Sequence, residues 1–232
     1  MSLPRYLIVN ADDLGQSASV NRGIMIGHER GVVTSASLMV RWPHAAEAAA
    51  LTRRSRLSIG LHLDLGEWTL RDGEWQPLYQ VVALDDRAAV ESEVSRQIDA
   101  FQALVGRNPT HLDSHQHVHM REPVREVVTE AARHLNIPVR SLGRVRYCGT
   151  FYGQTETGAA LPEAITVDAL IATLESLPDG ATEVACHPAD VVDLDTMYRL
   201  ERPHELQVLC DPRIRACVDA LGIQLISYAD MP

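Results

Sequence analysis

The stretch HLDSHQHVHM, residues 111–120, contains four of the ten histidines in this 232-residue chain, together with one aspartate. Imidazole nitrogens and carboxylate oxygens are common ligands of divalent metal ions, and histidine is also the usual proton carrier near neutral pH. The run lies inside the chain and is interrupted by leucine, serine and valine, which is not the pattern of a purification tag. The segment therefore indicates metal or acid–base chemistry.

The spacing within this segment leaves open which histidines face a common site. His115, His117 and His119 share one face if a strand continues through them, whereas only His115 and His119 do so if a helix has begun. We expect His111 to be structural. Asp113 is a candidate for orienting one of the imidazoles through a hydrogen bond.

Three other short segments carry ionisable residues: NADD at 10–13, GLHLD at 60–64 and CHPAD at 186–190. Neighbouring side chains point in opposite directions in an extended segment, so Asp12 and Asp13 are predicted to divide the roles of metal ligand and general base. Leucines and isoleucine alternate with other residues through 57–65, which places His62 on the opposite face of a strand.

Carboxylates and imidazoles that converge on one cavity form a ligand set for a divalent metal. A site with only three protein ligands leaves coordination positions open for water and substrate, which is typical of catalytic metal sites. Convergence requires a fold that brings residues from Asp12 to His187 to one place. The elements that carry these residues must therefore end at a common edge.

Apolar runs of strand length alternate with segments of helical periodicity along nearly the whole chain, a pattern of parallel strands joined by helical crossovers. The predicted strands are 5–11, 34–40, 57–65, 110–115, 137–141, 182–187 and 223–228. The predicted helices are 17–30, 43–54, 87–105, 121–135, 166–177 and one or two within 203–222, with loops at 66–85 and 142–162. Ser17 is expected to cap the first helix and Gly31 to end it, and Gly106 to end the helix at 87–105.

The predicted fold class is α/β, an irregular (β/α) barrel of about seven parallel strands in a single domain over residues 1–232. A doubly wound open sheet is the alternative. Both folds place ligands at the carboxyl ends of the parallel strands, where the four polar segments lie. The sequence thus predicts one active site at that end of the sheet.

Composition excludes several classes of partner. The chain is 46% hydrophobic and 22% charged, and its formal net charge is -10 at pH 7. This charge disfavours nucleic acid and anionic membranes as partners. The four cysteines form no C-x-x-C pair and no secretory signal is evident, so we expect reduced cysteines and a cytoplasmic location.

The segments IVNADDLG (8–15), GLHLDL (60–65), PTHLDSHQHVHM (109–120) and CHPAD (186–190) occur in this order, with VTS at 33–35 and FYG at 151–153. In this arrangement the chain resembles the YdjC-like carbohydrate deacetylase family, which includes chitooligosaccharide deacetylases, over nearly its whole length. The resemblance implies a metal-dependent N-deacetylase with an irregular (β/α) barrel. Its substrate would be an N-acetylated amino sugar or oligosaccharide.

The resemblance also implies individual roles. Asp13, His62 and His115 would bind the metal, Asp12 would be the general base, and His187 would be the acid that protonates the departing amine. The metal would polarise the acetyl carbonyl and lower the pKa of its water.

The residues themselves suggest further roles. Tyr152 and His117 are candidates to bind substrate, with His119 as the alternative to His117 for facing the substrate or supporting a ligand. Asp190 is a candidate to bind substrate or to keep His187 charged.

One divalent metal ion is expected. The family resemblance suggests magnesium, while two imidazoles and one carboxylate also suit zinc, manganese or cobalt. The partner would be a small acetylated sugar, and a homodimer is compatible with a chain of this size. Leu14 stands where the family often has phenylalanine, and residues 142–162 look shorter than in chitooligosaccharide-acting relatives.

Two alternatives stand beside this interpretation. The first is a metal-dependent hydrolase of another amide, an ester or a phosphoester, for which positive charge near the predicted loops would matter, at Arg121, Arg140, Arg144 and Arg146. The second is a non-catalytic module that binds sugar or metal. The presence of Asp12 and His187, which pure binding would not need, argues against the second alternative.

Overall fold

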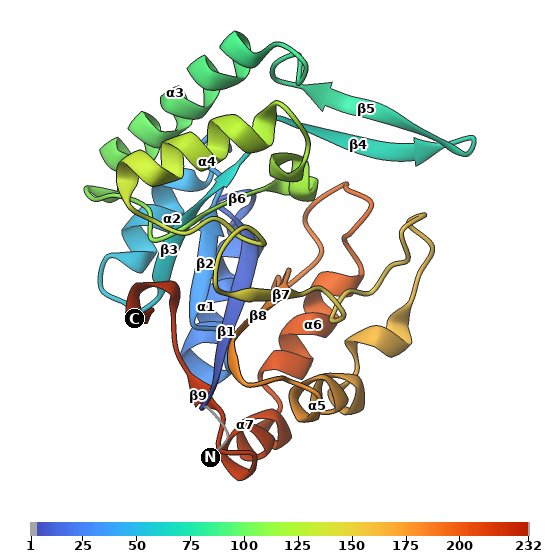
Figure 1. The fold of residues 1–232 in the computed structure, drawn as a ribbon. Helices are drawn as coiled ribbons and strands as arrows, with labels where there is room; N and C mark the ends of the chain where they lie inside the picture. The colour runs from blue at the N-terminus through green and yellow to red at the C-terminus, as the bar shows by residue number, and fades with distance from the viewer. Residues whose placement is uncertain (1–3, 232) are drawn as a thin grey trace.

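A computed structural model describes residues 4–231 as a curved parallel sheet surrounded by helices (Figure 1). The strands of this sheet are β1 (Arg5–Leu14), β2 (Ser35–Leu38), β3 (Ser58–Leu63), β6 (Leu112–Ser114), β7 (Arg146–Cys148), β8 (Gly180–Cys186) and β9 (Gln224–Leu225). Their order across the sheet is β6-β3-β2-β1-β8-β7, with β9 paired to β1 outside this path. Every pair in the sheet is parallel.

This order confirms the barrel-like prediction over the doubly wound alternative. Starting at β1, the chain adds β2, β3 and β6 in one direction, while β8 and β7 lie on the other side of β1. The strands thus follow one another around a circle that is open between β6 and β7. A doubly wound sheet would instead reverse direction at a switch point. The result is an incomplete barrel.

The helices connect successive strands, as the helical periodicity predicted. They are α1 (Ala18–Arg30), α2 (Ala45–Thr52), α3 (Arg87–Val105), α4 (Val124–Leu135), α5 (Val167–Glu175), α6 (Glu201–Leu209) and α7 (Pro212–Ala220), with 3-10 helices η1 (His115–Met120), η2 (Pro162–Ile165) and η3 (Tyr228–Asp230). Ser17 caps α1 by accepting a hydrogen bond from the Val20 N–H, and Gly31 ends that helix. Gly106 ends α3 in the left-handed region, with φ +79°.

The predicted loop at 66–85 is wrong in its first part. Residues Gly66–Arg71 and Glu74–Gln80 form the antiparallel hairpin β4–β5, which extends away from the main sheet (Figure 1). Its turn is Asp72-Gly73, with φ +53° and +82°. Two central residues with positive φ are what a tight hairpin turn requires, and Asp-Gly is among the dipeptides that favour it.

The predicted strand at 137–141 is also wrong. Only Val139 pairs with the sheet, through an isolated bridge to Leu112, because Ser141 adopts a positive φ of +63° and turns the chain away. The short strand β7 lies instead at Arg146–Cys148, inside the predicted loop at 142–162. The last predicted strand, 223–228, is reduced to the two residues of β9.

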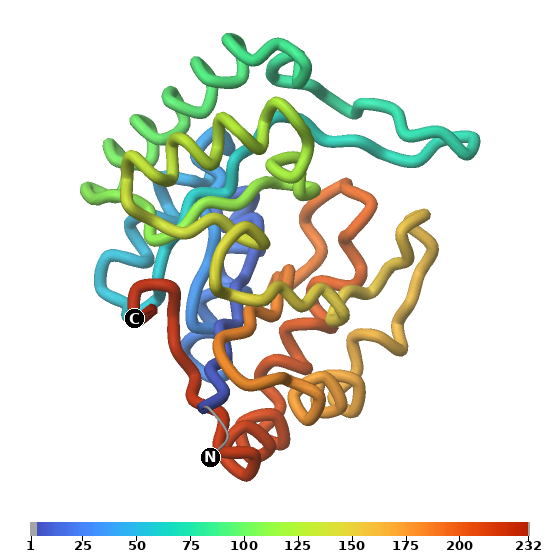
Figure 2. The backbone as a smooth tube through the Cα atoms, viewed as in Figure 1, coloured from blue at the N-terminus to red at the C-terminus, as the bar shows by residue number. Residues whose placement is uncertain are grey.

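A continuous apolar core fills the space between the sheet and its helices. Side chains of β1, such as Leu7 and Val9, pack with leucines of β3 and with Phe101 of α3. This packing holds the strands in place, so the positions of their carboxyl ends are fixed. Three segments project beyond these ends on the same side of the molecule: the β4–β5 hairpin, residues 149–161 and residues 188–200 (Figure 2).

Within residues 4–231, none of the helices combines the length and the apolar character that crossing a membrane would require. The four cysteines are all free thiols.

Candidate metal centre and active site

A cavity of about 880 Å³ lies at the carboxyl ends of the strands, where the sequence placed the site. Its floor contains residues from the ends of β1, β3, β6 and β8, and its walls come from the three projecting segments. The lining residues used below are Asp12, Asp13, Gln16, His62, Glu67, Trp68, Trp75, His115, His117, Arg121, Tyr147, Tyr152, His187, Tyr198 and Arg202. One cavity therefore collects most of the residues predicted for the site.

Asp12 and Asp13 both line this cavity, although neighbours in a regular strand would face opposite sides. The pairing of β1 with β2 is irregular between Ala11 and Leu14, and Asp13 has a positive φ of +66°. Aspartate tolerates this left-handed conformation better than most residues. The assumption of an extended segment fails here, and the backbone turn lets both carboxylates serve one site.

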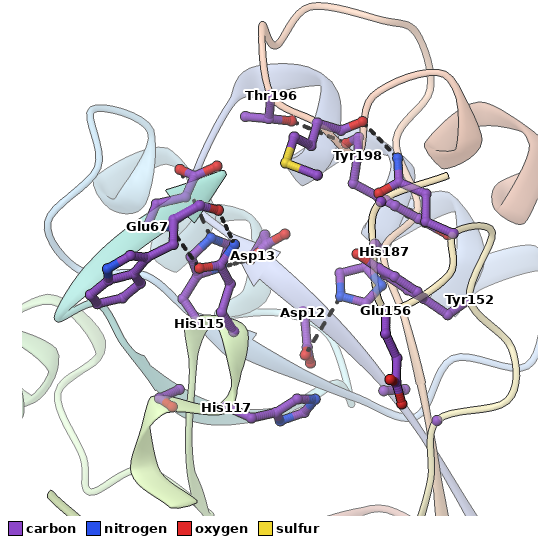
Figure 3. Close-up of a pocket in the computed structure, with 18 of the residues that line it drawn as sticks. Asp12, Asp13, Glu67, His115, His117, Tyr152, Glu156, His187, Thr196 and Tyr198 are labelled. Carbon is purple, nitrogen blue, oxygen red and sulfur yellow. Dashed lines mark hydrogen bonds and ion pairs between the residues drawn. The ribbon is translucent and has the colours of Figure 1, made fainter. Parts of the chain in front are cut away.

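Asp13, His62 and His115 meet at one point, as expected of a ligand set. Asp13 Oδ1 lies 3.4 Å from His62 Nε2 and 3.1 Å from His115 Nδ1. One donor atom from each residue lies within 4.8 Å of the others. Figure 3 shows Asp13 and His115 together on one side of the cavity. A carboxylate and two imidazoles in this arrangement could hold a divalent cation.

Two of these three residues, His62 and Asp13, are each held by another side chain through an atom that the cation would not use. His62 Nδ1 donates to Asp113 Oδ1 at 2.8 Å, which leaves Nε2 toward Asp13. Arg202 Nη2 donates to Asp13 Oδ2 at 2.6 Å, which leaves Oδ1 toward the imidazoles. Such partners orient metal ligands and fix the histidine tautomer.

The neighbouring charges favour the protonated forms of His62 and His115 and the ionised form of Asp13. Burial alone would depress the pKa of His62, but the carboxylates of Asp113 and Asp12 outweigh it and raise the pKa to about 10. Burial also opposes protonation of His115, yet the Asp13 carboxylate raises its pKa above the ordinary value. The Arg202 guanidinium overcomes the effect of burial on Asp13 and holds its pKa well below the usual range. The centre thus has a carboxylate that stays ionised.

Asp12, His62 and Asp113 form a second group with the spacing of a metal site. Here the positive charge is already present, because the fully buried Arg140 binds both carboxylates. Arg140 donates to Asp12 through Nη1 at 2.6 Å and Nη2 at 2.7 Å, and Nη2 lies 2.9 Å from Asp113 Oδ2. Asp12 therefore has both oxygens engaged, and the first group is the better cation site.

The surroundings of Asp12 keep it ionised. Its burial opposes ionisation, but the Arg140 guanidinium outweighs this and lowers the pKa of Asp12 below the ordinary value. Asn10 Nδ2 also donates to Asp12 Oδ1, at 2.8 Å. Asp12 Oδ2 lies 3.9 Å from His187 Nε2 across the cavity (Figure 3). Asp12 can thus accept a proton from a group bound between it and the ligand set.

His187 follows β8 and is enclosed by aromatic rings. The ring centroid of Tyr198 lies 5.2 Å from that of His187, and Tyr152, which stacks on Tyr198, lies 5.3 Å away. Burial lowers the pKa of His187 to about 4, so the imidazole is neutral at pH 7. Its backbone N–H donates to the buried Glu205 at 2.5 Å.

The expectation that Asp190 keeps His187 charged is wrong. Asp190 binds Arg22 of α1 at 2.6 Å and does not line the cavity. It lies three residues after His187, beyond the Pro188-Ala189 turn, and its backbone N–H donates to Ser19 of α1. The loop therefore anchors Asp190 to α1 rather than to the site.

The histidines after β6 separate into different roles because η1 turns the chain. Gln116 and His117 both have positive φ, +49° and +53°. His117 lines the cavity, and its Nε2 lies 3.1 Å from the Tyr147 hydroxyl. His119 points away and donates through Nε2 to the Arg140 carbonyl at 3.2 Å.

His111 is structural, as expected. Its ring stacks on Tyr228 with centroids 3.8 Å apart, and its Nε2 lies 3.1 Å from the Ser37 hydroxyl. It is completely buried. The histidine-rich segment thus contributes one presumptive metal ligand, one cavity residue and two residues that support the surrounding structure.

Four residues of the site were missed or misread. Arg140 is fully buried between carboxylates, not exposed on a loop, and Arg144 and Arg146 are exposed outside the cavity lining, so among the four arginines only Arg121 lies in it. Arg202, Glu205 and Glu67 had no predicted role. Glu67 comes from β4 and its Oε2 lies 3.9 Å from His115 Nε2. No motif in the sequence marks these residues, since each acts through tertiary contacts.

Comparisons with known proteins identify the family of the chain. The sequence profile of the YdjC-like protein family matches residues 6–220. A carbohydrate deacetylase from Geobacillus stearothermophilus is 34% identical over 251 aligned residues, which cover 98% of each chain. A chitooligosaccharide deacetylase from Serratia marcescens is 32% identical over 99% of this chain and 100% of that protein.

Solved structures of other proteins share the fold of this chain. A crystal structure from Enterococcus faecalis V583, described as a candidate cellobiose-phosphate cleavage protein, has a TM-score of 0.75 and 27% identity, and covers 97% of this chain and 98% of its own. A family 4 carbohydrate esterase from Streptomyces lividans, in complex with acetate, has a TM-score of 0.56 at 15% identity over 99% and 96% of the two chains. That likeness concerns the fold alone. Since the profile and the relatives span nearly all of the sequence, the chain belongs to the YdjC-like family.

Proposed function

We propose that this protein is a divalent-metal-dependent carbohydrate deacetylase that hydrolyses the acetamido group of an N-acetylated amino sugar. The observation that carries the proposal is the meeting of Asp13, His62 and His115 beside Asp12 and His187 in one cavity. Both named relatives are deacetylases, of carbohydrate and of chitooligosaccharide. The overall reaction joins water to the amide and yields acetate and a free amine.

Asp13, His62 and His115 would hold the cation. Their donor set fits it, because Asp113 and Arg202 bind the outward atoms of two ligands and leave the inward atoms free. When bound, the metal would act as a Lewis acid that activates water and polarises the acetyl carbonyl. One carboxylate and two imidazoles suit zinc, manganese or cobalt, and magnesium is the remaining candidate.

Asp12 would act as the general base. It is ionised, it lines the cavity next to the ligand set, and Arg140 fixes both of its oxygens in place. A carboxylate held this way cannot rotate away from the proton that it is to accept. General-base assistance of this type contributes about 10²–10⁴-fold to a rate.

His187 would deliver a proton to the departing amine. Because burial holds its pKa near 4, His187 is neutral before the reaction and must collect that proton during turnover. Asp12 Oδ2, 3.9 Å from His187 Nε2, is the nearby group that can supply it. The proton removed from water would then reach the nitrogen of the breaking C–N bond, so that acetate and amine leave without a net change of protonation on the enzyme.

Aromatic side chains give the cavity a surface suited to sugar rings. Tyr152 lies next to His187, and Trp68 and Trp75 of the β4–β5 hairpin line the opposite wall. Such rings pack against the apolar faces of sugars while hydroxyls remain available for hydrogen bonds. We propose Tyr152 and His117 as substrate-binding residues.

The test is release of acetate from N-acetylglucosamine and its oligomers by protein stripped of metal and then reloaded with a single divalent ion. Acetate release that requires the added metal supports the proposal. Cellobiose phosphate and a generic phosphodiester serve as competing substrates. Phosphoester cleavage without acetate release from any acetylated sugar would assign the site to a different hydrolase.

A further inference from the structure

Several residues that line the cavity carry a buried nitrogen atom without a hydrogen-bond partner. Within residues 4–231, seven buried side-chain atoms have no hydrogen-bond partner, and four of them are nitrogens. All four nitrogens belong to residues that line the cavity: Gln16 Nε2, His115 Nε2, His187 Nδ1 and Arg202 Nη1. A buried donor without an acceptor costs about 1–3 kcal/mol, so such groups are rarely left together unless a ligand meets them.

Two of these atoms, on Gln16 and Arg202, can only donate. Arg202 is nearly fully buried and uses Nη2 to bind Asp13 Oδ2 at 2.6 Å and Nε to bind the Tyr198 carbonyl at 2.7 Å. Its Nη1 is the remaining arm of the same rigid planar group. That arm therefore lies beside the carboxylate of a presumptive metal ligand.

Gln16 stands next to Arg202. Its Oε1 accepts from Arg202 Nη2 at 3.4 Å, which fixes the orientation of the amide, because the opposite orientation would turn an N–H toward a guanidinium N–H. The Nε2 donor is consequently the free end of the side chain. Gln16 itself is 2% exposed and its backbone N–H donates to the Asp13 carbonyl at 3.0 Å.

We infer that Gln16 Nε2 and Arg202 Nη1 form a donor pair that binds an acyl oxygen: the oxygen that becomes negative as water adds to the acetyl carbonyl, and then the carboxylate of the acetate product. The inference rests on the proposed function and adds a substrate-binding site to it. Both residues contact Asp13, Arg202 through its ion pair and Gln16 through its backbone N–H, and Arg202 supplies a fixed positive charge. Fixed donors aimed at a developing negative oxygen stabilise the transition state of acyl transfer.

The two free N–H donors suit a small anion. Arg202 is balanced by the Asp13 carboxylate, so the two together are neutral, and Gln16 adds a second N–H donor without charge. A ligand oxygen with partial or full negative charge is the acceptor that such a pair prefers. Product acetate should therefore bind here and inhibit the enzyme.

The experiment measures inhibition by sodium acetate of the metal-loaded protein and, by calorimetry, direct binding of acetate. Gln16→Glu keeps the shape and the acceptor that faces Arg202 but replaces the free donor by a second acceptor. Arg121→Gln, in the same cavity, alters the net charge by the same amount without touching the pair. We expect the acetate inhibition constant to rise about tenfold or more in Gln16→Glu and to stay within about twofold in Arg121→Gln.

Arg202→Lys is a second variant, which keeps the charge toward Asp13 but removes Nη1. We expect it to weaken acetate binding while metal content, measured by mass spectrometry, stays near one equivalent. Equal inhibition in wild type and Gln16→Glu would overturn the inference, even if acetate release is intact. If inorganic phosphate instead bound more tightly than acetate and showed the same dependence on Gln16, the pair would serve a phosphate group and the acyl assignment would be wrong.

The proposed function can fail separately. Should wild-type protein release no acetate from any acetylated sugar, that function is excluded, and calorimetry with acetate and phosphate still tests whether Gln16 and Arg202 bind an anion.

Discussion

Asp12 and Asp13 are consecutive residues, yet each is held by a different buried arginine: Arg140 binds both oxygens of Asp12, and Arg202 binds one oxygen of Asp13. The backbone turn at Asp13 makes this division possible. Asp13 keeps an oxygen directed at two imidazoles, whereas Asp12 Oδ2 lies 3.9 Å from His187 Nε2 across the cavity. The two carboxylates are thus assigned different chemistry by their partners.

Replacing each aspartate by asparagine should separate these roles. Asp13→Asn is expected to lose both the metal and acetate release, because the amide carries no charge for the cation. Asp12→Asn is expected to keep the metal and lose at least about 100-fold in turnover, as removal of a general base does. Metal content after dialysis and the rate of acetate release provide the two measurements. Metal loss in Asp12→Asn with retention in Asp13→Asn would mean that the assignments are exchanged.

Asp113 should control metal affinity without touching the metal. Its hydrogen bond to His62 Nδ1 sets the tautomer and increases the basicity of Nε2. We expect Asp113→Asn to weaken metal binding about 10–100-fold, measured by competition with a chelator. Asp64→Asn is the matched control, since Asp64 is an equally buried carboxylate that binds Tyr79 and Trp42 instead. An unchanged affinity in Asp113→Asn would remove this residue from the metal centre.

Gly60 in β3 should not tolerate a side chain. A Cβ at this position would lie 2.3 Å from the ring of His111, which is itself locked against Tyr228. We expect Gly60→Ala to lower the free energy of unfolding by about 1–3 kcal/mol through overpacking. Gly143→Ala, where the nearest atom is 3.8 Å away, should have little effect. Denaturant unfolding of the two variants makes the comparison, and equal stability would show that the His111 ring can move.

Arg140 should be among the most sensitive positions for stability. It is completely buried and forms ion pairs with Asp12, Asp113 and Glu183. Arg140→Met leaves these carboxylates without their cation and is expected to destabilise the fold by about 3–5 kcal/mol. Arg87→Met, which removes ion pairs of an exposed arginine with two exposed glutamates, should have little effect on stability, because exposed ion pairs are screened by water. Comparable losses in the two variants would contradict this ranking.

Glu205 should make stability depend on pH. Burial raises its pKa from 4.5 to about 8, so between these values the folded protein holds a proton that the unfolded chain has released. The free energy of unfolding contributed by Glu205 therefore falls as pH rises from about 5 to about 8. Glu205→Gln cannot titrate.

As pH rises from about 5 to about 8, the melting temperature of Glu205→Gln should accordingly increase relative to that of wild type. Both proteins are measured in buffers that contain a chelator. The substitution also weakens one of the hydrogen bonds from His187 and Tyr198, which lowers the melting temperature at every pH. The change with pH is thus the informative quantity. Parallel curves for the two proteins would show that Glu205 is ionised in the fold.

Several parts of the fold could be read from the sequence because local signals were strong. Helix α3 agrees with the prediction at both ends, where Asp86 and Gly106 provide a cap and a left-handed stop. The Asp-Gly turn of the hairpin was equally local, but β5 is almost entirely exposed, β4 is buried only at its first two residues, and neither strand alternates clearly. Their pairing depends on the turn more than on an apolar face, which explains why this segment looked like a loop.

The convergence of Asp13, His62 and His115 could be predicted because these residues lie at the carboxyl ends of strands, and parallel strands end at one edge. Their supporting arginines could not. Arg140 comes from a segment whose extended structure stops after a single bridge, and Arg202 lies in the first turn of α6, far along the chain from Asp13. An arginine that is buried between carboxylates has no distinguishing local pattern, since only the packed fold reveals which charges it meets.

The β4–β5 ribbon is bonded to itself along its length, and of its residues the cavity receives chiefly Glu67 and two tryptophans. The residues proposed for hydrolysis and the tryptophans proposed to contact the sugar consequently lie on separate segments of the chain. Lengthening the ribbon or exchanging its tryptophans would reshape the entrance while the strand ends below stay in register. We therefore expect that changes in the ribbon can alter which substrates enter the cavity without altering the residues proposed to cleave the amide.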